Sequence, residues 1–460
     1  MIRVFSHWVQ PATIIGVISD FAFVLIGIGI AFAWIGNGLP VEWDLVGIYS
    51  LMLALTILVL NASLGFYHRV QTHTFLQTRA RAVLTLHLSI PIAYGLYLLL
   101  PMATVNKQFL QLSAMGAVFG MLVNRLRAYH MPPPQIMMSR VLIFGCGDKA
   151  QEVARIIGQS DRHVEIVGYV PGLAGEKSVV PAEHVIDTDG SLPMTARKLD
   201  VDEIILAIME RRGGAMPLRE LLDCKLYGVR VLDLATHFEQ FLGQIRLDSL
   251  KASYLIFGEG FRQTFLRNAI KRAFDFICSL ILLTLASPVM IGAAIAIVVE
   301  TGFPLFYRQE RVGLDGRLFY VIKFRSMRTD AEKDGKPQWA KAGDSRVTRV
   351  GRIIRKLRID ELPQLISVLK GDMSLVGPRP ERQFFVDKLT QDIPFYAVRH
   401  SVKPGVTGWA QVRYPYGASV EDAMQKLQYD LYYVKNHTLF LDMVILFETV
   451  GVVLSGKGAQ

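Results

Sequence analysis

Four long apolar runs occupy the first part of the chain and are separated by short polar stretches. A helix needs about 20 residues to cross the hydrocarbon core of a bilayer, and each run is near this length. The runs cover residues 14–36, 45–66, 82–102 and 108–124. The pattern predicts a four-helix transmembrane bundle over residues 1–130, and a buried bundle of a water-soluble protein is the alternative.

Basic residues near the ends of these runs are concentrated on one side of the predicted membrane. That side carries Arg3, Arg69, Arg79, Arg81, Arg125 and Arg127. The other side has Lys107 together with Glu42 and Asp44. Because Lys and Arg near membrane helices are retained on the cytoplasmic side, we expect both ends of the bundle in the cytoplasm.

The hydrophobic pattern changes after Met131–Pro134, which is typical of a stiff linker. Residues 140–150 predict a buried strand, a Gly-rich turn and the start of a helix. Further apolar runs follow at residues 164–170, 203–208 and 229–234, alternating with helical stretches. The sequence therefore predicts a Rossmann-like cytoplasmic domain over residues 131–262.

The predicted Rossmann-like domain lacks two features of a working dinucleotide site. Val170-Pro171-Gly172 stands at the end of the second strand, where an acidic residue would bind the ribose. The domain also has no Tyr-x-x-x-Lys pair for dehydrogenase or epimerase chemistry. We expect a structural, dimerising or regulatory role, and a nucleotide-sugar dehydratase or epimerase is the alternative.

A fifth apolar run, residues 273–299, contains a proline and is flanked by cations on both sides. The flanking cations are Arg262, Arg267, Lys271 and Arg272 before the run, and Arg308, Arg311 and Arg317 after it. Pro288 removes a backbone donor near the middle of the run, where Ser287 can supply a hydrogen bond. The pattern predicts a re-entrant membrane helix over residues 266–299 that breaks at Ser287 and Pro288, and an ordinary transmembrane helix is the alternative.

Composition and charge agree with a membrane protein that handles anionic partners. Hydrophobic residues make up 51% of the chain, and the mean hydropathy is +0.32. The net charge of +10 suits anionic lipid or a phosphorylated substrate, and we do not expect a nucleic acid partner. The three cysteines have no CxxC spacing, so neither a disulfide framework nor a zinc site is predicted.

The candidate chemistry lies where a run of cations meets an adjacent carboxylate pair, Asp360 and Glu361. The cations are Arg349, Arg352, Arg355, Lys356 and Arg358. Pro363 suits the first turn of a new helix and biases Leu362 away from helical geometry. We therefore expect the carboxylates in a sharp joint before a helix over residues 364–370, whose dipole favours their ionised forms.

A second loop, Gly377-Pro378-Arg379-Pro380, should hold one guanidinium rigidly in place. Carboxylates beside fixed cations suit phosphoryl transfer. One carboxylate can attack phosphorus, the other can hold Mg²⁺, and the cations can neutralise the transferred group. A solvated, salt-bridged helix is the alternative.

Four motifs in the last part of the chain closely resemble the bacterial sugar transferase family. They are Lys323-Phe-Arg-Ser-Met327, Lys356-Leu-Arg-Ile-Asp-Glu-Leu-Pro-Gln364, Met373-Ser-Leu-Val-Gly-Pro-Arg-Pro380 and Lys403-Pro-Gly-Val-Thr-Gly-Trp-Ala-Gln-Val412. The motifs occur in the family's order over residues 266–460. The resemblance is to the polyprenol-phosphate phosphoglycosyl transferases, whose large members prime exopolysaccharide and O-antigen synthesis.

This resemblance implies a membrane α plus α/β fold whose catalytic domain, residues 263–460, is monotopic and cytoplasmic at the bacterial inner membrane. It implies transfer of hexose 1-phosphate from a UDP-sugar to undecaprenyl (polyprenyl) phosphate, with release of UMP. We assign Asp360 as the nucleophile that forms a covalent phosphosugar–aspartate, and Glu361 as the Mg²⁺ ligand. The expected substrate-binding residues are Lys323, Arg325, Arg355, Arg358, Gly377, Pro378, Arg379 and Pro380.

The resemblance also bears on the membrane helix and on the strand before the catalytic pair. Lys271, Arg272 and Asp275 match the family motif at the start of the helix, where contact with lipid head groups is expected. Residues 320–327 predict a strand that carries Lys323 and Arg325 on one face. Residues 329–345 predict a mobile loop, and residues 439–454 predict an amphipathic helix in the membrane plane.

Two positions depart from the commoner family pattern. Arg413–Gly417 stands where many members have a short Asn-Gly-Arg run, and Arg358 stands where many have Ser. The sugar is therefore not predicted. A homodimer through the Rossmann-like domain is one arrangement that the sequence allows, and a membrane scaffold that binds anionic lipid is the non-enzymatic alternative.

Overall fold

The computed structural model describes residues 2–4, 7–9, 11–35, 43–67, 75–99, 107–130, 138–160, 164–172, 178–187, 191–208, 216–248, 250, 252–258, 260–261, 264–328, 346–414, 417 and 419–455. The predicted linker at residues 131–134 and the predicted loop at residues 329–345 lie outside this part. The described chain forms two compact units, built mainly from Trp8–Leu242 and from Gly243–Gln460.

Four helices of the first unit lie on the four predicted apolar runs. They are α1 (Pro11–Ile35), α2 (Trp43–Ser63), α3 (Phe75–Leu99) and α4 (Lys107–His130), and the short strands β1 (Ile2–Val4) and β2 (His7–Val9) precede them. In the described part of the chain, two helices are long and apolar enough to cross a membrane, Thr13–Trp34 within α1 and Phe265–Thr301. That the four helices form a transmembrane bundle stays a prediction.

Helices α1 and α4 pack through glycines. A Cβ atom placed on Gly27 would overlap the backbone of Gly116, and a Cβ atom on Gly116 would overlap Gly27. Gly120, one turn further along α4, has the same relation to Phe23 of α1. Gly116 and Gly120 form a Gly-x-x-x-Gly pair, which in membrane helices lets two backbones approach closely.

A buried polar cluster joins the same two helices. Asp20 is completely buried and accepts hydrogen bonds from Asn124 Nδ2 (2.6 Å) and from the Tyr67 hydroxyl (2.7 Å). Ser19 Oγ donates to Asn124 Oδ1 (2.8 Å). Because each contact satisfies a polar group between packed helices, the cluster fixes the relative position of α1 and α4.

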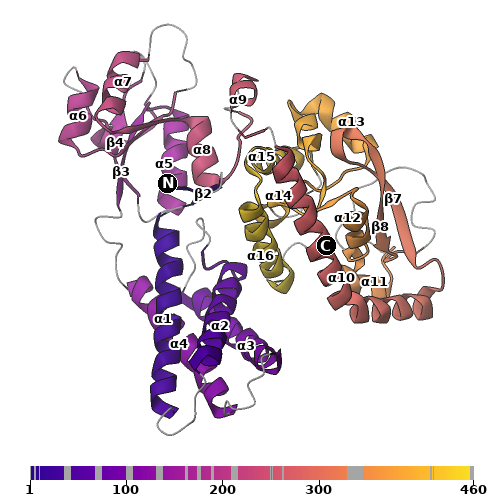
Figure 1. Cartoon of the computed structure of the whole chain (residues 1–460). Coiled ribbons are helices and arrows are strands. Elements are labelled where there is room, and N and C mark those ends of the chain that lie inside the picture. Colours follow the sequence, from indigo (N-terminus) through magenta and orange to yellow (C-terminus); the bar gives the residue numbers. More distant parts are fainter. Residues whose placement is uncertain are drawn as a thin grey trace. The chain divides into compact units, whose positions relative to one another are not determined.

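The first unit also contains a parallel four-stranded sheet. Its strands are β3 (Ser139–Phe144), β4 (Val164–Val170), β5 (Glu203–Leu206) and β6 (Arg230–Asp233), in the order β4-β3-β5-β6. The short 3-10 helix Ala182–His184 follows β4. Helices α5 (Asp148–Ser160) and α8 (Leu234–Leu242) cover one face, and α6 (Leu192–Lys198) and α7 (Leu218–Leu226) cover the other (Figure 1). Alternating residues of β3 face the two layers, with Ile143 on the α5 side and Leu142 on the α6 side.

The main hydrophobic core of the second unit includes Val312, Leu365, Leu375, Leu431 and Ile445, and a smaller cluster contains Ala293, Ile297, Phe324 and Ile354. Its helices are α9 (Ala252–Phe257), α10 (Phe265–Thr301), α11 (Arg349–Lys356), α12 (Gln364–Lys370), α13 (Gln383–Asp392), α14 (Trp409–Arg413), α15 (Val420–Asn436) and α16 (Leu439–Ser455). Strands β7 (Phe306–Val312) and β8 (Leu318–Phe324) are antiparallel, and β9 (Ser374–Val376) and β10 (Gly405–Thr407) are parallel. The 3-10 helices Leu314–Gly316, Ile359–Glu361 and Tyr396–Ser401 connect them.

The segment that precedes α10 belongs to this second unit. Ile245 is 1% exposed in its core, and the Ile245 amide donates to the carbonyl of Gln428 (3.0 Å). Trp409 Nε1 donates to the Gly243 carbonyl (2.8 Å), and Lys435 Nζ donates to the Tyr254 hydroxyl (2.7 Å). The unit therefore begins near Gly243, earlier than the boundary expected at residue 263.

Helix α10 is continuous over 37 residues and contains Pro288. Figure 1 shows its two halves running in different directions. Pro288 leaves the carbonyl of Thr284 without its usual amide donor, and Ser287 Oγ donates to that carbonyl at 2.7 Å. The hydrogen bond expected of Ser287 is thus present, and the re-entrant path through a membrane stays a prediction.

Helix α16 differs from the expectation of a helix lying in the membrane plane. Leu441 and Ile445 are completely buried in the core of the second unit. Its two acidic residues are also buried, and each meets a cation of the same unit: Asp442 pairs with Lys271 and Glu448 with Arg413. The sequence pattern showed an apolar helix with two charges but could not show that the protein itself surrounds them.

Candidate active site

The carboxylate pair Asp360–Glu361 lies in a tight joint between two helices. Arg358 has a left-handed backbone (φ 58°), and Ile359–Glu361 then form one 3-10 turn. Helix α12 begins at Gln364, directly after Pro363, as the sequence predicts. Leu362 is helical (φ −56°, ψ −35°), so its expected extended conformation was wrong. The 3-10 turn continues through it, because the Leu362 amide donates to Ile359 O and Leu362 O accepts from the amide of Leu365.

Glu361 is held by three cations from three segments of the chain. Its Oε1 atom lies 2.7 Å from Arg379 NH2 and 3.1 Å from Lys323 Nζ, and its Oε2 atom lies 3.4 Å from Arg358 NH1. Burial alone would raise the pKa of Glu361, but Arg379, Lys323 and Arg358 outweigh it and hold that pKa well below its usual range. Four residues predicted for the site are therefore in direct contact.

Asp360 lies beside this cluster in a different electrostatic environment. Its side chain is 8% exposed, and its Oδ1 atom accepts no hydrogen bond from the described residues. Burial, followed by the neighbouring Glu361 charge, raises the pKa of Asp360 to about 6, against the opposing influence of Lys323, Arg355 and Arg358. Arg355 therefore acts on Asp360 electrostatically, from the last turn of α11.

Hydrogen bonds from neighbouring segments hold the backbone of the Gly377–Pro380 loop. The Gly377 amide donates to Thr407 O (2.9 Å), and the Gly405 amide donates to Pro378 O (3.0 Å). A Cβ atom on Gly377 would overlap the carbonyl of Lys403 in the neighbouring segment, so only glycine fits there. Arg311 NH1 reaches the Pro380 carbonyl at 3.1 Å. The loop can therefore present the Arg379 guanidinium in one place.

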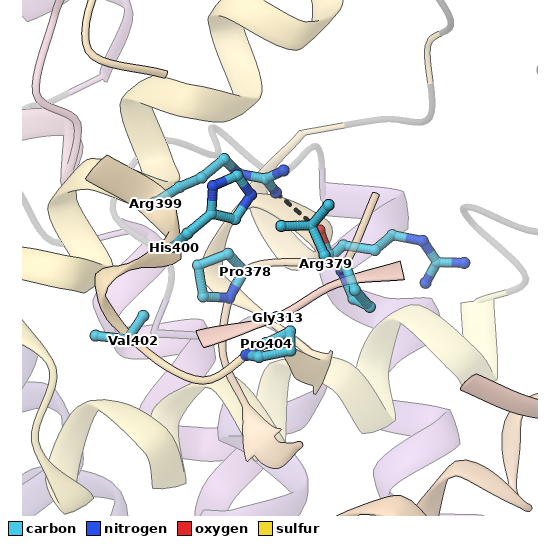
Figure 2. A pocket seen from close by; sticks show the side chains of 9 residues that line it. Gly313, Pro378, Arg379, Arg399, His400, Val402 and Pro404 are labelled. Atoms are coloured by element: carbon cyan, nitrogen blue, oxygen red, sulfur yellow. Dashed lines mark hydrogen bonds between the residues drawn. The ribbon is translucent and has the colours of Figure 1, made fainter. Parts of the chain in front are cut away.

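A buried ion pair supports this loop from behind. Arg399 NH2 donates to the Arg379 carbonyl (2.9 Å) and lies 2.8 Å from Asp430 Oδ2, and the side chains of Arg399 and Asp430 are 6% and 3% exposed. Figure 2 shows this hydrogen bond, with the Arg379 guanidinium extending away from Arg399. A small pocket next to this contact is lined mainly by prolines and valines, together with Gly313, Arg379, Arg399 and His400.

Three other predicted residues are placed elsewhere. Strand β8 ends at Phe324, so Arg325 does not share a strand face with Lys323 as expected. The chain turns away there, and Arg325 NH2 donates to the carbonyls of Thr301 (3.1 Å) and Gly302 at the end of α10. Lys271 and Arg272 bind protein groups, Asp442 and the carbonyl of Leu369, and their contact with lipid head groups stays a prediction.

Sequence reasoning missed the supporting residues Arg399, Asp430 and Arg311, and did not see what Asp275 contacts. Arg399 lies just before the Lys403 motif, which was the one available signal. Its partner Asp430 lies in another helix. A single sequence does not show which two distant charged residues form a buried pair.

The carboxylate pair has donor atoms suitable for Mg²⁺. Asp360 Oδ1 is buried and without a partner in the described part of the chain, and Glu361 is next to it. The described residues contain no group of three or more His, Cys, Asp or Glu that could hold a metal by themselves. This donor set suits Mg²⁺, which is commonly bound by one or two carboxylates together with substrate phosphates.

Comparison with known proteins places this site in a family. A sequence model described as "Bacterial sugar transferase" matches residues 266–456, which include the whole cluster. The UDP-N-acetylgalactosamine-undecaprenyl-phosphate N-acetylgalactosaminephosphotransferase of Aeromonas hydrophila is 44% identical over 242 residues, or 53% of this chain and 56% of the relative. The chain thus spans about half the length of that relative.

Two further relatives are matched over more of their length. The UDP-glucose:undecaprenyl-phosphate glucose-1-phosphate transferase of Caulobacter vibrioides is 44% identical over 193 residues, or 41% of this chain and 71% of the relative. The uncharacterized sugar transferase EpsL of Bacillus subtilis is 43% identical over 191 residues, or 42% of this chain and 90% of the relative. Because a relative of this identity is matched over nearly its whole length, the chain belongs to the bacterial sugar transferase family.

Proposed function

We propose that the protein transfers a hexose 1-phosphate from a UDP-sugar to undecaprenyl or another polyprenyl phosphate, releasing UMP. This would be the first membrane step of exopolysaccharide or O-antigen synthesis. The observation that supports it best is the pair Asp360–Glu361, in which one carboxylate is held by three cations and the other has a buried oxygen without a partner. The relatives from Aeromonas and Caulobacter are named for activities of this class.

In the proposed first step, an Asp360 carboxylate oxygen attacks the phosphorus atom that carries the sugar. A new P–O bond forms to Asp360, and the bond to the oxygen that bridges the two phosphates breaks. UMP leaves with the electron pair of that bond. The guanidinium of Arg379 and the ammonium of Lys323 form ion pairs with Glu361. When substrate binds, both can turn toward the non-bridging phosphate oxygens, where negative charge accumulates.

In the proposed second step, a phosphate oxygen of the polyprenyl phosphate attacks the same phosphorus atom. The bond to Asp360 breaks, the carboxylate is regenerated, and a polyprenyl-diphosphate sugar is formed. Glu361 would hold Mg²⁺, which would supply further neutralisation of phosphate charge when bound. One cationic site can in this way accept a soluble anion first and a membrane-borne anion second.

The proposed function needs the site to lie at a membrane surface. We propose a multi-pass protein of the bacterial inner membrane, with a four-helix bundle over residues 1–130, a Rossmann-like domain up to about residue 262 and a catalytic domain thereafter. Helix α10 would enter and leave on the cytoplasmic side. Its exposed apolar residues, with Leu285 at 72% and Val299 at 81% exposure, support insertion into the membrane. The Rossmann-like domain is the proposed surface for a homodimer.

The decisive measurement is the intact mass of detergent-purified protein after incubation with Mg²⁺ and a panel of UDP-sugars, without acceptor. We expect a hexose-phosphate adduct with one sugar, and no adduct and no turnover for Asp360→Asn. Replacement of Asp by Asn keeps the shape but removes the nucleophilic charge. Binding of Mg²⁺ and UDP-sugar to the variant, followed by calorimetry, shows that it still folds.

The other outcomes separate the alternatives. Appreciable turnover by Asp360→Asn would rule out this nucleophile. UMP released only after polyprenyl phosphate is added, without an adduct, would replace the covalent route by direct displacement. Neither adduct nor UMP would favour the membrane scaffold.

A further inference from the structure

We propose that the turn of α10 from Lys271 to Asp275 is a positioning element for both halves of the active site. It holds the Arg379 loop through β9 and the Asp360–Glu361 pair through α12. The expected effect on the transfer rate rests on the function proposed above. The structural contacts of this turn with β9 and α12 do not depend on that function. Asp275 and Arg272 are positioning residues here, because neither contacts Asp360 or Glu361 in the structure.

Asp275 binds the strand that leads into the Arg379 loop. Its side chain is almost fully buried, with 3% of the residue exposed. Asp275 Oδ2 accepts a hydrogen bond from Ser374 Oγ (2.7 Å), and Oδ1 accepts from the amide of Leu375 (3.3 Å). Both partners lie in β9, which ends at Val376, directly before Gly377.

Lys271 extends this contact to the next residue of the strand. Its Nζ atom lies 3.3 Å from Asp275 Oδ1 and 2.9 Å from Oδ2 of the completely buried Asp442. Asp442 Oδ1 lies 2.8 Å from the Tyr433 hydroxyl, which in turn lies 2.9 Å from the carbonyl of Val376. The contacts therefore reach the last residue of β9 from a second side.

Arg272 binds the other half of the site. Its guanidinium donates to the carbonyls of Val368 and Leu369 (2.7 Å to the latter), in the last turn of α12. Helix α12 is only seven residues long, and its first residue, Gln364, lies three residues after Glu361. A shift of this short helix along its axis would therefore move the carboxylate pair.

Three of the atoms that this turn binds directly are main-chain atoms, Leu375 N, Val368 O and Leu369 O. Val376 O is reached only indirectly, through Asp442 and the Tyr433 hydroxyl. Buried ion pairs add little stability compared with apolar packing. Hydrogen bonds to the main chain instead set where a backbone lies, and small displacements of a catalytic group can lower a rate by about 100-fold.

The test uses the full-length protein in detergent and two variants of similar size, Asp275→Asn and Ser374→Ala. The matched control is Ser279→Ala, one turn further along α10. Ser279 is completely buried, and its hydroxyl has no hydrogen-bond partner among the described residues. Amide hydrogen exchange is measured for the peptide that contains residues 374–380, and it requires no activity.

We expect faster exchange in this peptide for Asp275→Asn and Ser374→Ala, and unchanged exchange for Ser279→Ala. In the transfer assay we expect kcat/KM for the UDP-sugar to fall by about 10- to 100-fold for Asp275→Asn. In an Arg379→Gln background the same substitution should have much less effect, because the loop no longer carries the guanidinium that it positions.

Two results would overturn the proposal. One is unchanged exchange at residues 374–380 in both variants. The other is a loss of activity from Asp275→Asn that is equally large with and without Arg379, since this would mean a general loss of stability. If Asp275→Asn fails to fold, Ser374→Ala, which removes a single hydroxyl, carries both measurements. Failure of the unmutated protein to transfer sugar phosphate would contradict the proposed function. Hydrogen exchange at residues 374–380 would then still test whether Asp275 positions this segment.

Discussion

Asp360 and Glu361 are adjacent and carry the same chemical group, yet the fold gives them opposite electrostatic environments. Three cations contact Glu361 and keep its pKa low, whereas burial and the Glu361 charge raise the pKa of Asp360 to about 6. Pairs of carboxyl groups whose pKa values are driven apart in this way commonly have different catalytic roles. Because a more basic oxygen is the better nucleophile, this difference supports the proposal that Asp360 attacks phosphorus.

The raised pKa of Asp360 predicts how activity depends on pH. Above about pH 6 the carboxyl group is ionised and can attack, and below that pH it becomes protonated. We therefore expect the rate of adduct formation to fall about tenfold per pH unit below pH 6. Single-turnover rates between pH 5 and pH 8 test this, and a rate that stays constant down to pH 5 would contradict it.

The Arg399–Asp430 pair gives a second prediction at this scale. In Arg399→Lys the lysine ammonium can still pair with Asp430. It lacks the forked guanidinium, which binds Asp430 and also donates to the Arg379 carbonyl. We expect a melting temperature close to that of the unmutated protein and a kcat/KM about tenfold lower. Arg246→Lys, in the more exposed pair with Asp248, is the control and should change neither.

Sequence motifs predicted the residues that meet in the site but not the residues that support them. Lys323, Arg358, Glu361 and Arg379 come together as expected, because each lies in a recognisable motif. Arg325 shares a motif with Lys323 yet binds the end of α10, because the strand stops one residue too early. Where a strand ends depends on tertiary contacts that a two-residue alternation does not encode.

At the scale of elements, the position of a helix was predicted more reliably than its surroundings. Helix α12 and the four N-terminal helices lie where apolar periodicity and Pro363 placed them. Helix α16 also lies at its predicted position, but it is part of the protein core. Hydrophobicity shows that a face avoids water, and it does not show whether lipid or protein covers that face.

The glycine contact between α1 and α4 gives a prediction about the N-terminal helices. Replacing Gly116 by Leu would force the two backbones apart, because even a Cβ atom overlaps Gly27. We expect a lower melting temperature of the full-length protein in detergent. Gly29→Leu is the matched control, since a Cβ atom there meets no other atom within 4 Å. Equal destabilisation by both substitutions would contradict the prediction.

At the scale of the whole molecule, the chain divides before the part matched by the family. The match begins at residue 266, whereas the second compact unit begins at Gly243. Ile245 and Tyr254 lie in between and contribute packing and a hydrogen bond to that unit. A boundary inferred from motifs alone misses such a segment, because its residues carry no recognisable chemistry.

This division predicts where a catalytic fragment can start. We expect residues 243–460 to form adduct in detergent, and residues 266–460 to be unstable or inactive because Ile245 no longer fills the core. In the full-length protein, Ile245→Ala should lower the free energy of unfolding by about 2–5 kcal/mol. A fully active, equally stable fragment from residue 266 would show that the earlier segment is dispensable.

The ion pair between Lys271 and Asp442 has a consequence for how the protein is made. Lys271 leaves the ribosome long before Asp442, so in the proposed topology α10 would meet the membrane while this cation still lacks its buried partner. At that moment Lys271 would be an ordinary flanking charge and could hold its end of the helix on the cytoplasmic side. Once synthesis reached α16, the same side chain would become buried in the protein. Lys271 would thus first help to set the topology of α10 and later form a buried ion pair with Asp442. The active site would be completed only after α16 has been translated.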